Sequence, residues 1–357
     1  NFYCGVPDSL LKYICAKFTD ELSDKEHVIT ANEGSAVGLA SGCHIATGKV
    51  PMVYMQNSGL GNTVNPLTSL TAPEIYGVPM LLLIGWRGEP GVKDEPQHTK
   101  KGAITLQLLE TMKVPYEVIP EDMEQARKVI EKAKKIAVEN STPFALVVRK
   151  GLFAKYSLKN VKEDKSELER EEAIKTVLEN TKSENSVYLG NTGKIGRELY
   201  EIRRSMEQTG ERDFLNVGSM GHTSQIALGI AMHTEKKVYC LDGDGAVIMH
   251  MGGLTSIGDL AGKNFIHIIL NNLAHDSVGG QPTIADRIDF CKIANACGYR
   301  ETYKTNSEKG LTTLLEKKLE GPVLIEVVIK KGARSELGRP KESPRENKEM
   351  LMSYLQR

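Results

Sequence analysis

The feature that most constrains the fold is the alternation of short β-branched runs with longer, helix-like stretches along the chain. Alternation of this kind is typical of parallel sheets that are covered by helices on both faces. We therefore predict an α/β fold built from doubly wound parallel sheets. The predicted strands are Val50–Met55, Met80–Ile84, Phe144–Val148, Val187–Leu189, Phe214–Val217, Val238–Leu241, Phe265–Leu270 and Val323–Ile329.

A charged segment divides the chain into two halves. From Ser157 to Glu172 the sequence SLKNVKEDKSELEREE is nearly free of apolar residues, as in a solvated connection. A length of 357 residues also suggests two domains. We predict domains over residues 1–152 and 173–332, a linker over 153–172 and a C-terminal extension over 333–357. Pro340 and Pro344 predict no regular helix before about Glu346, and the extension is either disordered or docked on the body.

Composition excludes several classes of function. Lys and Arg total 46 and balance 46 Asp and Glu, so neither nucleic acid nor an anionic membrane is an expected partner. No apolar run approaches the roughly 20 residues of a membrane span. The six cysteines form no CxxC pair and no secretory leader is seen, which predicts free thiols in a reducing cytoplasm. The chain begins at Asn1, so we expect a few native residues before it.

The most informative stretch runs from Val238 to Asn272. One predicted strand leads into Gly243-Asp244-Gly245, and the next ends in Asn271-Asn272. Because adjacent parallel strands deliver their carboxyl ends to one edge, Asp244 and Asn272 are expected to lie together. Their oxygens suit Mg²⁺, and the glycines allow a diphosphate to approach the backbone closely. We predict a metal-diphosphate cradle, and the alternative is a structural turn with an incidental Asn pair.

This GDG sequence followed by NN resembles the diphosphate-and-magnesium motif of thiamine diphosphate enzymes. The resemblance implies thiamine diphosphate and Mg²⁺ as cofactors. Asp244, the side chain of Asn272 and the backbone carbonyl of Ala274 would be the metal ligands, with Gly243 and Gly245 against the cofactor.

Two further segments resemble elements of the same family. Asn32-Glu33-Gly34 resembles the segment whose Glu activates the cofactor's pyrimidine, so Glu33 would take that role. Its alternative is a helix-start glutamate stabilised by the macrodipole. Gly218-Ser219-Met220-Gly221 resembles the family's G-x-[apolar]-G element. Met220 would hold the cofactor bent and the Gly218 carbonyl would accept its amino group, or Met220 is an ordinary core residue.

The resemblance also implies an architecture. The N-terminal half would be the pyrimidine-binding domain and the C-terminal half the diphosphate-binding domain, with no room for a middle domain. In this family the two domains usually meet across a subunit interface, so we expect at least a homodimer with its sites at that interface.

Near the start, Gly5-Val6-Pro7-Asp8-Ser9 resembles the GVP loop of 2-keto acid decarboxylases. Asp8 would serve in proton transfer, or else cap the helix that follows. Further on, Gln56–Asn62 follows a strand and could place amide and hydroxyl groups at the pocket.

The segment Gly85–His98 carries the only Trp, two Gly-Pro-type turns and two cations directly after a strand. With the GVPDS, QNSGLGN, GSMGH and LGRP segments it resembles phosphonopyruvate decarboxylases closely and sulfopyruvate decarboxylases more loosely. That implies decarboxylation of a 2-keto acid bearing a phosphonate, within phosphonate biosynthesis. Arg87 and Lys93 could bind the phosphonate, or remain solvated surface cations.

One departure from simple pyruvate decarboxylases favours a dianionic substrate. Ser277 stands where those enzymes carry a Glu, whose charge would repel a phosphonate or sulfonate. His98, His275 and Asp276 remain candidate acid–base groups, and both histidines could instead be packed structural residues. The rival functions are sulfopyruvate decarboxylation, carboligation of the acetolactate synthase type, and an inactive cofactor-binding protein, which the presence of Glu33 disfavours.

Overall fold

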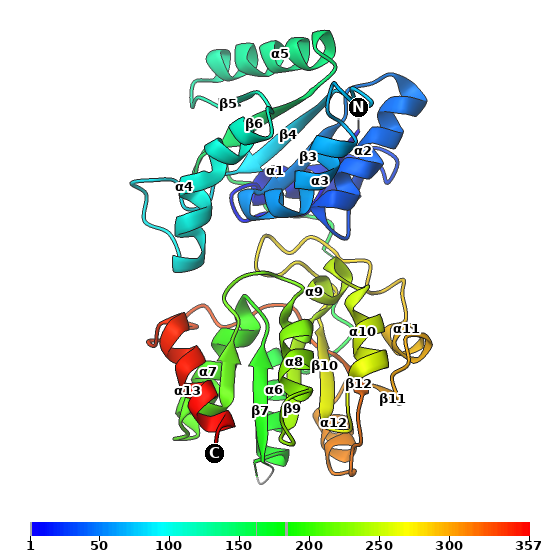
Figure 1. Ribbon diagram of the computed structural model, residues 1–357, viewed down its shortest axis with the longest axis vertical. Coiled ribbons are helices and arrows are strands. Elements are labelled where there is room, and N and C mark those ends of the chain that lie inside the picture. The colour runs from blue at the N-terminus through cyan, green and yellow to red at the C-terminus, as the bar shows by residue number, and fades with distance from the viewer. Residues whose placement is uncertain (1, 162, 183–184) are drawn as a thin grey trace. The chain divides into compact units, whose positions relative to one another are not determined.

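The computed structural model describes residues 2–161, 163–182 and 185–357, and the chain forms two compact units. Unit 1 comprises Asn1–Val161 with Val278–Gln281, and unit 2 comprises Lys162–Ser277 with Pro282–Arg357. The predicted linker 153–172 includes residue 162, which lies outside the described residues. Each unit is built on its own six-stranded sheet (Figure 1).

Unit 1 contains a parallel sheet with the strand order β2-β1-β3-β4-β6-β5. Its strands are β1 (Tyr3–Gly5), β2 (His27–Ile29), β3 (Met52–Gln56), β4 (Met80–Gly85), β5 (Tyr116–Val118) and β6 (Pro143–Val148). Its helices are α1 (Lys12–Glu21), α2 (Glu33–Thr47), α3 (Leu60–Ser69), α4 (Pro96–Thr111) and α5 (Met123–Glu139), with a 3₁₀ turn η1 (Asn57–Gly59).

The pleat of β4 explains why helices cover both faces of this sheet. All six of its residues are buried, and successive side chains point to opposite faces. Leu82 packs in a cluster with residues of α2, α3 and α4, whereas Leu83 packs in a second cluster with residues of α1 and α5. A strand that is apolar on both faces therefore requires a helical layer on each side.

Unit 2 contains a parallel sheet with the order β11-β12-β10-β9-β7-β8. Its strands are β7 (Ser186–Gly190), β8 (Asp213–Leu215), β9 (Lys237–Gly243), β10 (Phe265–Asn271), β11 (Glu301–Thr305) and β12 (Val323–Val328). Its helices are α6 (Arg170–Asn180), α7 (Lys194–Ser205), α8 (Thr223–Ala231), α9 (Asp244–Met249), α10 (Gly253–Leu260), α11 (Phe290–Ala296), α12 (Glu308–Leu315) and α13 (Pro344–Leu355), with a 3₁₀ turn η2 (Gly210–Arg212). Numbered within their own unit, the strands of both sheets follow the order 2-1-3-4-6-5, so the two halves share one topology.

The predicted α/β fold with doubly wound parallel sheets is confirmed, and every predicted strand overlaps an observed one. The sequence-based prediction missed β1, β2, β5 and β11. Three of these have only three residues, too few to display a period, and β11 is a half-exposed edge strand of sequence ETYKT. No helix in the described ranges is long and apolar enough to cross a bilayer.

The C-terminal extension ends in helix α13, which packs on unit 2. The expectation that no helix starts before about Glu346 is wrong by two residues, because proline is well tolerated at the first helical position and Pro344 occupies it. Ser343 and Glu346 complete a capping box there. The buried Asn347 amide donates to the Asp213 carbonyl at 2.8 Å and accepts from the Leu215 N–H at 2.9 Å, joining α13 to β8.

Candidate active site

The candidate residues of each unit follow the carboxyl ends of parallel strands. In unit 1 they come after β1, β2, β3 and β4, and in unit 2 after β8, β9 and β10. In open α/β sheets this edge is where ligands bind.

Asp244 and Asn272 come together at the edge formed by β9 and β10. The register pairs Gly243 with Leu270, so both strands end at the same level. The backbone of Asn272 is close enough to the Asp244 carboxylate to lower its pKa, so the two residues lie side by side. The predicted juxtaposition is thus present in the structure.

The Asp244 carboxyl group is buried, and its side-chain partner among the described residues is a neutral hydroxyl group. It is 2% exposed, and burial raises its pKa to about 7 even though Thr283 Oγ1 donates to it at 2.5 Å. No Lys or Arg pairs with Asp244 in the ranges that the structure describes. A buried carboxylate without a positive partner is costly, and a bound divalent cation would remove that cost. Asp244 therefore fits a metal ligand, and sequence reasoning missed Thr283, which carries no motif signal.

The loop after β10 turns sharply around the same place. Leu273 has a φ of 60°, and the Asn272 side-chain oxygen accepts from the Ala274 N–H at 3.2 Å. No described N–H group donates to the Ala274 carbonyl, so this oxygen is available to a ligand. By contrast, the Asn271 amide donates to Glu326 at 2.9 Å and is used inside the sheet.

Met220 and His275 converge on Gly245 at the start of α9. A Cβ on Gly245 would lie 3.4 Å from Met220 Cε and 3.3 Å from His275 Cε1, so the glycine leaves room for both side chains. Burial lowers the pKa of His275 to about 4, which keeps the ring neutral near pH 7. A neutral imidazole can accept or donate a hydrogen bond but brings no positive charge.

A tight turn presents Met220. Ser219 and Gly221 both have positive φ values, 51° and 84°. A Cβ on Gly221 would lie 2.6 Å from His250 Cδ2, so only glycine fits there. The Gly218 N–H is held by the Asn216 side chain at 3.3 Å. Met220 is only partly buried and therefore differs from an ordinary core methionine.

Glu33 is the first residue of α2 and is 5% exposed. Its Oε2 accepts from the Asn62 amide at 2.7 Å. A Cβ on Gly59 would lie 2.5 Å from Glu33 Cδ and closer still to Oε1, so the carboxyl group occupies the space that a side chain at 59 would need. Asn32 caps helix α2, because its side-chain oxygen accepts from the Ser35 N–H at 2.9 Å. The Glu33 carboxyl group is therefore not needed to cap the helix.

Asp8 is fully buried and stands at the centre of a polar network in unit 1. Its Oδ1 accepts from Gln56 Nε2 at 2.6 Å, and its Oδ2 accepts from the Leu10 N–H at 3.0 Å. Burial raises the pKa of Asp8 although these bonds oppose the shift. The bond to Leu10 resembles capping of the turn before α1, so the geometry leaves both predicted roles of Asp8 in place.

The segment Gln56–Asn62 contacts both acidic candidates of unit 1 and the loop after β4. Gln56 binds Asp8, Asn62 binds Glu33, and the Asn57 amide donates to the Arg87 carbonyl at 2.8 Å and to Thr105 at 2.8 Å. The expectation that this segment supplies amide groups to a site thus has a structural counterpart.

Arg87 is engaged by an acidic partner that sequence reasoning missed. Its guanidinium donates to both oxygens of Asp94, at 2.8 and 2.5 Å, and also to Ser9 Oγ at 2.7 Å. The hydrogen bonds from Arg87 hold the pKa of Asp94 well below its usual range. An anion that binds Arg87 must therefore compete with Asp94 or share the cation with it. Lys93, next to Asp94, is exposed.

The loop that carries these residues is closed on itself. Trp86 Nε1 donates to the Gly102 carbonyl at 2.9 Å, and a Cβ on Gly102 would overlap the backbone of Gly88. His98 lies in the same loop and helix start, with its Nδ1 buried and unpartnered among the described residues. Burial and the nearby Arg87 lower the pKa of His98 to about 4.

Asp276 is held in an ion-pair cluster. Its carboxylate accepts from Lys194 at 3.1 Å and lies 3.4 Å from Arg170, which also binds Glu198 at 2.7 and 2.8 Å. Burial alone would raise the pKa of Asp276, but these cations hold it below the ordinary value. Asp276 therefore stays ionised and anchors the loop instead of exchanging protons. Its neighbour Ser277 is exposed, with its hydroxyl beside Gly193.

Comparison with known proteins agrees with this geometry. The N-terminal TPP binding domain of thiamine pyrophosphate enzymes matches residues 1–108, and the C-terminal TPP binding domain matches residues 191–327. Phosphonopyruvate decarboxylases of Streptomyces viridochromogenes and Streptomyces hygroscopicus are each 32% identical over 96% of this chain, covering 88% and 87% of their own lengths. A sulfopyruvate decarboxylase of Methanosarcina acetivorans is 32% identical over 84% of this chain and 81% of its own length. The chain therefore belongs to the thiamine pyrophosphate enzymes, in the family that contains the phosphonopyruvate and sulfopyruvate decarboxylases.

Proposed function

We propose that this chain is a carboxy-lyase that converts 3-phosphonopyruvate to phosphonoacetaldehyde and CO₂, using thiamine diphosphate and Mg²⁺. The observation that carries the proposal is the similarity to two phosphonopyruvate decarboxylases over 96% of the chain. The chain also carries an acidic residue at each place where the proposed chemistry needs one, Glu33 in unit 1 and Asp244 in unit 2.

In unit 2, Asp244, the side-chain oxygen of Asn272 and the carbonyl of Ala274 would hold Mg²⁺. Three hard oxygen donors leave room in an octahedral shell for phosphate oxygens and water. The fit rests on the Asp244 carboxyl group, which is buried beside Asn272 and whose pKa burial raises to about 7. Thr283 would fix the carboxylate's orientation.

Bound thiamine diphosphate supplies an electron sink that accepts the electron pair left behind when CO₂ departs. The Glu33 carboxyl group accepts a hydrogen bond from Asn62 and lies in the space left by the missing side chain of Gly59. From there it would hydrogen-bond the pyrimidine nitrogen and so support proton loss from the reactive carbon. Met220 would pack beneath the cofactor, and the Gly218 carbonyl would accept from its amino group.

The overall reaction replaces the carboxylate of the substrate by a proton. Asp8 is our first candidate for the group that delivers it, because burial raises its pKa toward the range where a carboxyl group keeps its proton. His275 and His98 are the alternatives; because their pKa values are lowered to about 4, each would have to act near pH 7 through the single N–H of a neutral ring.

Arg87 is the proposed ligand of the phosphonate, and the exposed Lys93 would add positive charge to the same loop. Guanidinium groups bind phosphate-like oxygens in pairs, as Arg87 already binds Asp94. A phosphonate would therefore take over part of the coordination that Asp94 provides. Ser277, which adds no negative charge, would leave the approach open to a dianion.

The second candidate is sulfopyruvate decarboxylation, favoured by the Methanosarcina acetivorans relative. A sulfonate has the same shape as a phosphonate and one negative charge fewer. For either substrate we propose a homo-oligomer whose sites lie between subunits, working in a reducing cytoplasm. All six cysteines are free, which supports that compartment.

The test is CO₂ release from phosphonopyruvate, sulfopyruvate and pyruvate, offered in parallel with thiamine diphosphate and Mg²⁺. Preferred turnover of phosphonopyruvate, lost in Glu33→Gln, is the expected result. Preference for sulfopyruvate would replace the substrate and keep the mechanism, whereas no CO₂ from any of the three would contradict the proposal. Light scattering of the purified protein measures the oligomer directly.

A further inference from the structure

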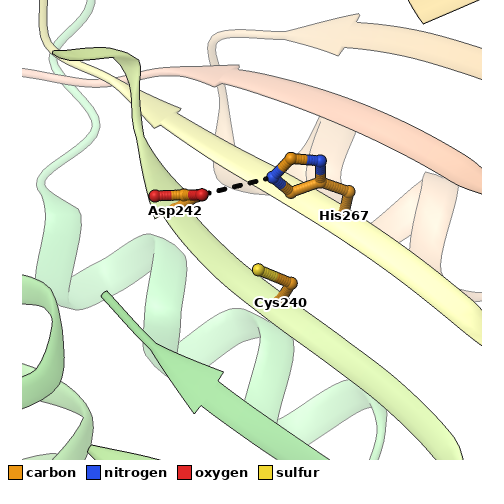
Figure 2. A group of neighbouring side chains, drawn as sticks. All are labelled: Cys240, Asp242 and His267. Carbon is orange, nitrogen blue, oxygen red and sulfur yellow. Dashed lines mark ion pairs between the residues drawn. The ribbon is translucent and has the colours of Figure 1, made fainter. Parts of the chain in front are cut away.

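A second group of metal-ligating side chains lies inside the unit 2 sheet. Cys240 and Asp242 alternate along β9, and His267 stands opposite Cys240 on β10. Because residues two apart on a strand share a face, all three side chains point to the same side of the sheet. Figure 2 shows them gathered there.

This side of the sheet is sealed from solvent. Cys240, Asp242 and His267 are each 0% exposed. One ligand atom from each residue lies within 4.8 Å of the other two. The opposite face carries the apolar cluster with Tyr239, Leu241 and Ile268, so the polar group is confined to one face.

Two atoms in this group lack hydrogen-bond partners. Asp242 Oδ2 and His267 Nε2 are buried without a hydrogen-bond partner among the described residues, and the dashed line in Figure 2 marks the 3.6 Å contact that they make with each other. That separation is too long for a hydrogen bond. An oxygen and a nitrogen ligand, each about 2.0–2.2 Å from a tetrahedral zinc ion, would lie roughly 3.3–3.5 Å apart, which is close to the Asp–His distance.

The second ring nitrogen of His267 and the second carboxylate oxygen of Asp242 each have a hydrogen-bond partner, as is usual for residues that bind a metal. His267 Nδ1 lies 3.0 Å from Tyr299 Oη, and Asp242 Oδ1 accepts from the Gly243 N–H at 3.0 Å. Partners of this kind orient a ligating imidazole or carboxylate toward its ion. They leave Nε2 and Oδ2 without a hydrogen bond, facing each other.

We propose that Cys240, Asp242 and His267 hold one zinc ion inside the unit 2 sheet and supply three of its ligands. A thiolate, a carboxylate and a neutral imidazole give a zinc complex with zero net charge, which suits a site without solvent. The thiolate selects a softer metal than Mg²⁺, so this site differs in chemistry from the oxygen donors around Asp244. Because the site is closed, the ion would enter as the domain folds.

The test is metal content of the full-length protein, produced with added zinc and then dialysed against EDTA. We expect about one zinc per chain, retained in Asp244→Asn, which removes a ligand of the proposed Mg²⁺ site. The variants Cys240→Ala and His267→Asn should lose it, while Cys43→Ser, a partly exposed thiol of unit 1, should keep it.

A second readout uses the wild-type protein alone, so it does not depend on variants that fold poorly. Protein produced in cobalt-containing medium should show a thiolate-to-cobalt charge-transfer band together with the visible bands of tetrahedral Co²⁺. Wild-type protein without stoichiometric zinc or without the thiolate band would overturn the proposal, as would folded Cys240→Ala with full zinc. Neither result bears on decarboxylation, which is measured separately.

Discussion

Replacing Gly59 by alanine should displace the Glu33 carboxyl group without straining the backbone. Gly59 has φ −76° and ψ −13°, values that alanine adopts freely. An added Cβ would lie 2.5 Å from Cδ and Cγ of Glu33, whereas ordinary contacts are 3.4–4 Å. The carboxyl group must therefore move by about 1 Å, and the hydrogen bond from Asn62 must lengthen or break.

The expected magnitude follows from that displacement. A misplacement of about 1 Å in a group that positions the reaction costs roughly 100-fold in rate. Overpacking of a buried site lowers the free energy of unfolding by about 1–3 kcal/mol. Both effects should appear in Gly59→Ala, and the loss of rate should persist at saturating thiamine diphosphate.

The matched control is Gly61→Ala, two positions further on in α3. A Cβ on Gly61 meets no atom within 4 Å, so this change should leave activity unchanged and should raise stability by about 0.5–1 kcal/mol. The assay is CO₂ release together with urea denaturation of both variants. Gly59→Ala with activity within a few-fold of wild type would refute the reasoning that the position of the Glu33 carboxyl matters.

Three further predictions concern other contacts. Asp94→Asn frees the Arg87 guanidinium and should lower the KM for phosphonopyruvate about fivefold, roughly 1 kcal/mol; an unchanged KM would exclude Arg87 as phosphonate ligand. The folded-state pKa of His98 is about 4 against an ordinary 6.5, so the unfolded chain binds more protons between these values and stability falls as pH drops through this window. His98→Gln should remove at most about 3 kcal/mol of that acid sensitivity, and urea midpoints at pH 4.5 and 7.5 that fall equally in both proteins would contradict this origin. Asn347→Ala leaves two buried backbone groups of β8 unpaired and should cost about 2–4 kcal/mol, visible as a lower urea midpoint; no change there would show that α13 is not anchored in this way.

The sequence predicts those parts of the fold whose pattern lies within a single run of consecutive residues. Long apolar strands such as Met80–Gly85 leave no alternative to a buried parallel sheet. Asp244 and Asn272 could be paired in advance because each follows a strand, and parallel strands end at one edge. Short strands such as Tyr3–Gly5 carry too few residues to display a pattern.

The contacts that sequence reasoning missed join side chains from separate elements. Nothing near Thr283 indicates that its hydroxyl reaches Asp244, because Thr283 follows Asp244 by 39 positions that include helices α9 and α10 and strand β10. Asp94 lies in the segment Gly85–His98, and only the folded loop shows that its carboxylate accepts hydrogen bonds from both Arg87 and the Gly88 N–H. The sequence did indicate Asn62 as a site residue, because it lies in the segment Gln56–Asn62, but it did not indicate that Asn62 binds Glu33.

The most direct test of the central claim is the rate of CO₂ release from phosphonopyruvate by wild-type protein and by Glu33→Gln, both saturated with thiamine diphosphate and Mg²⁺. The Gln side chain preserves the size of Glu33 and removes its charge. The account predicts turnover by the wild type and a loss of at least about 100-fold in the variant. Equal rates in the two proteins, or no CO₂ from the wild type, would contradict it.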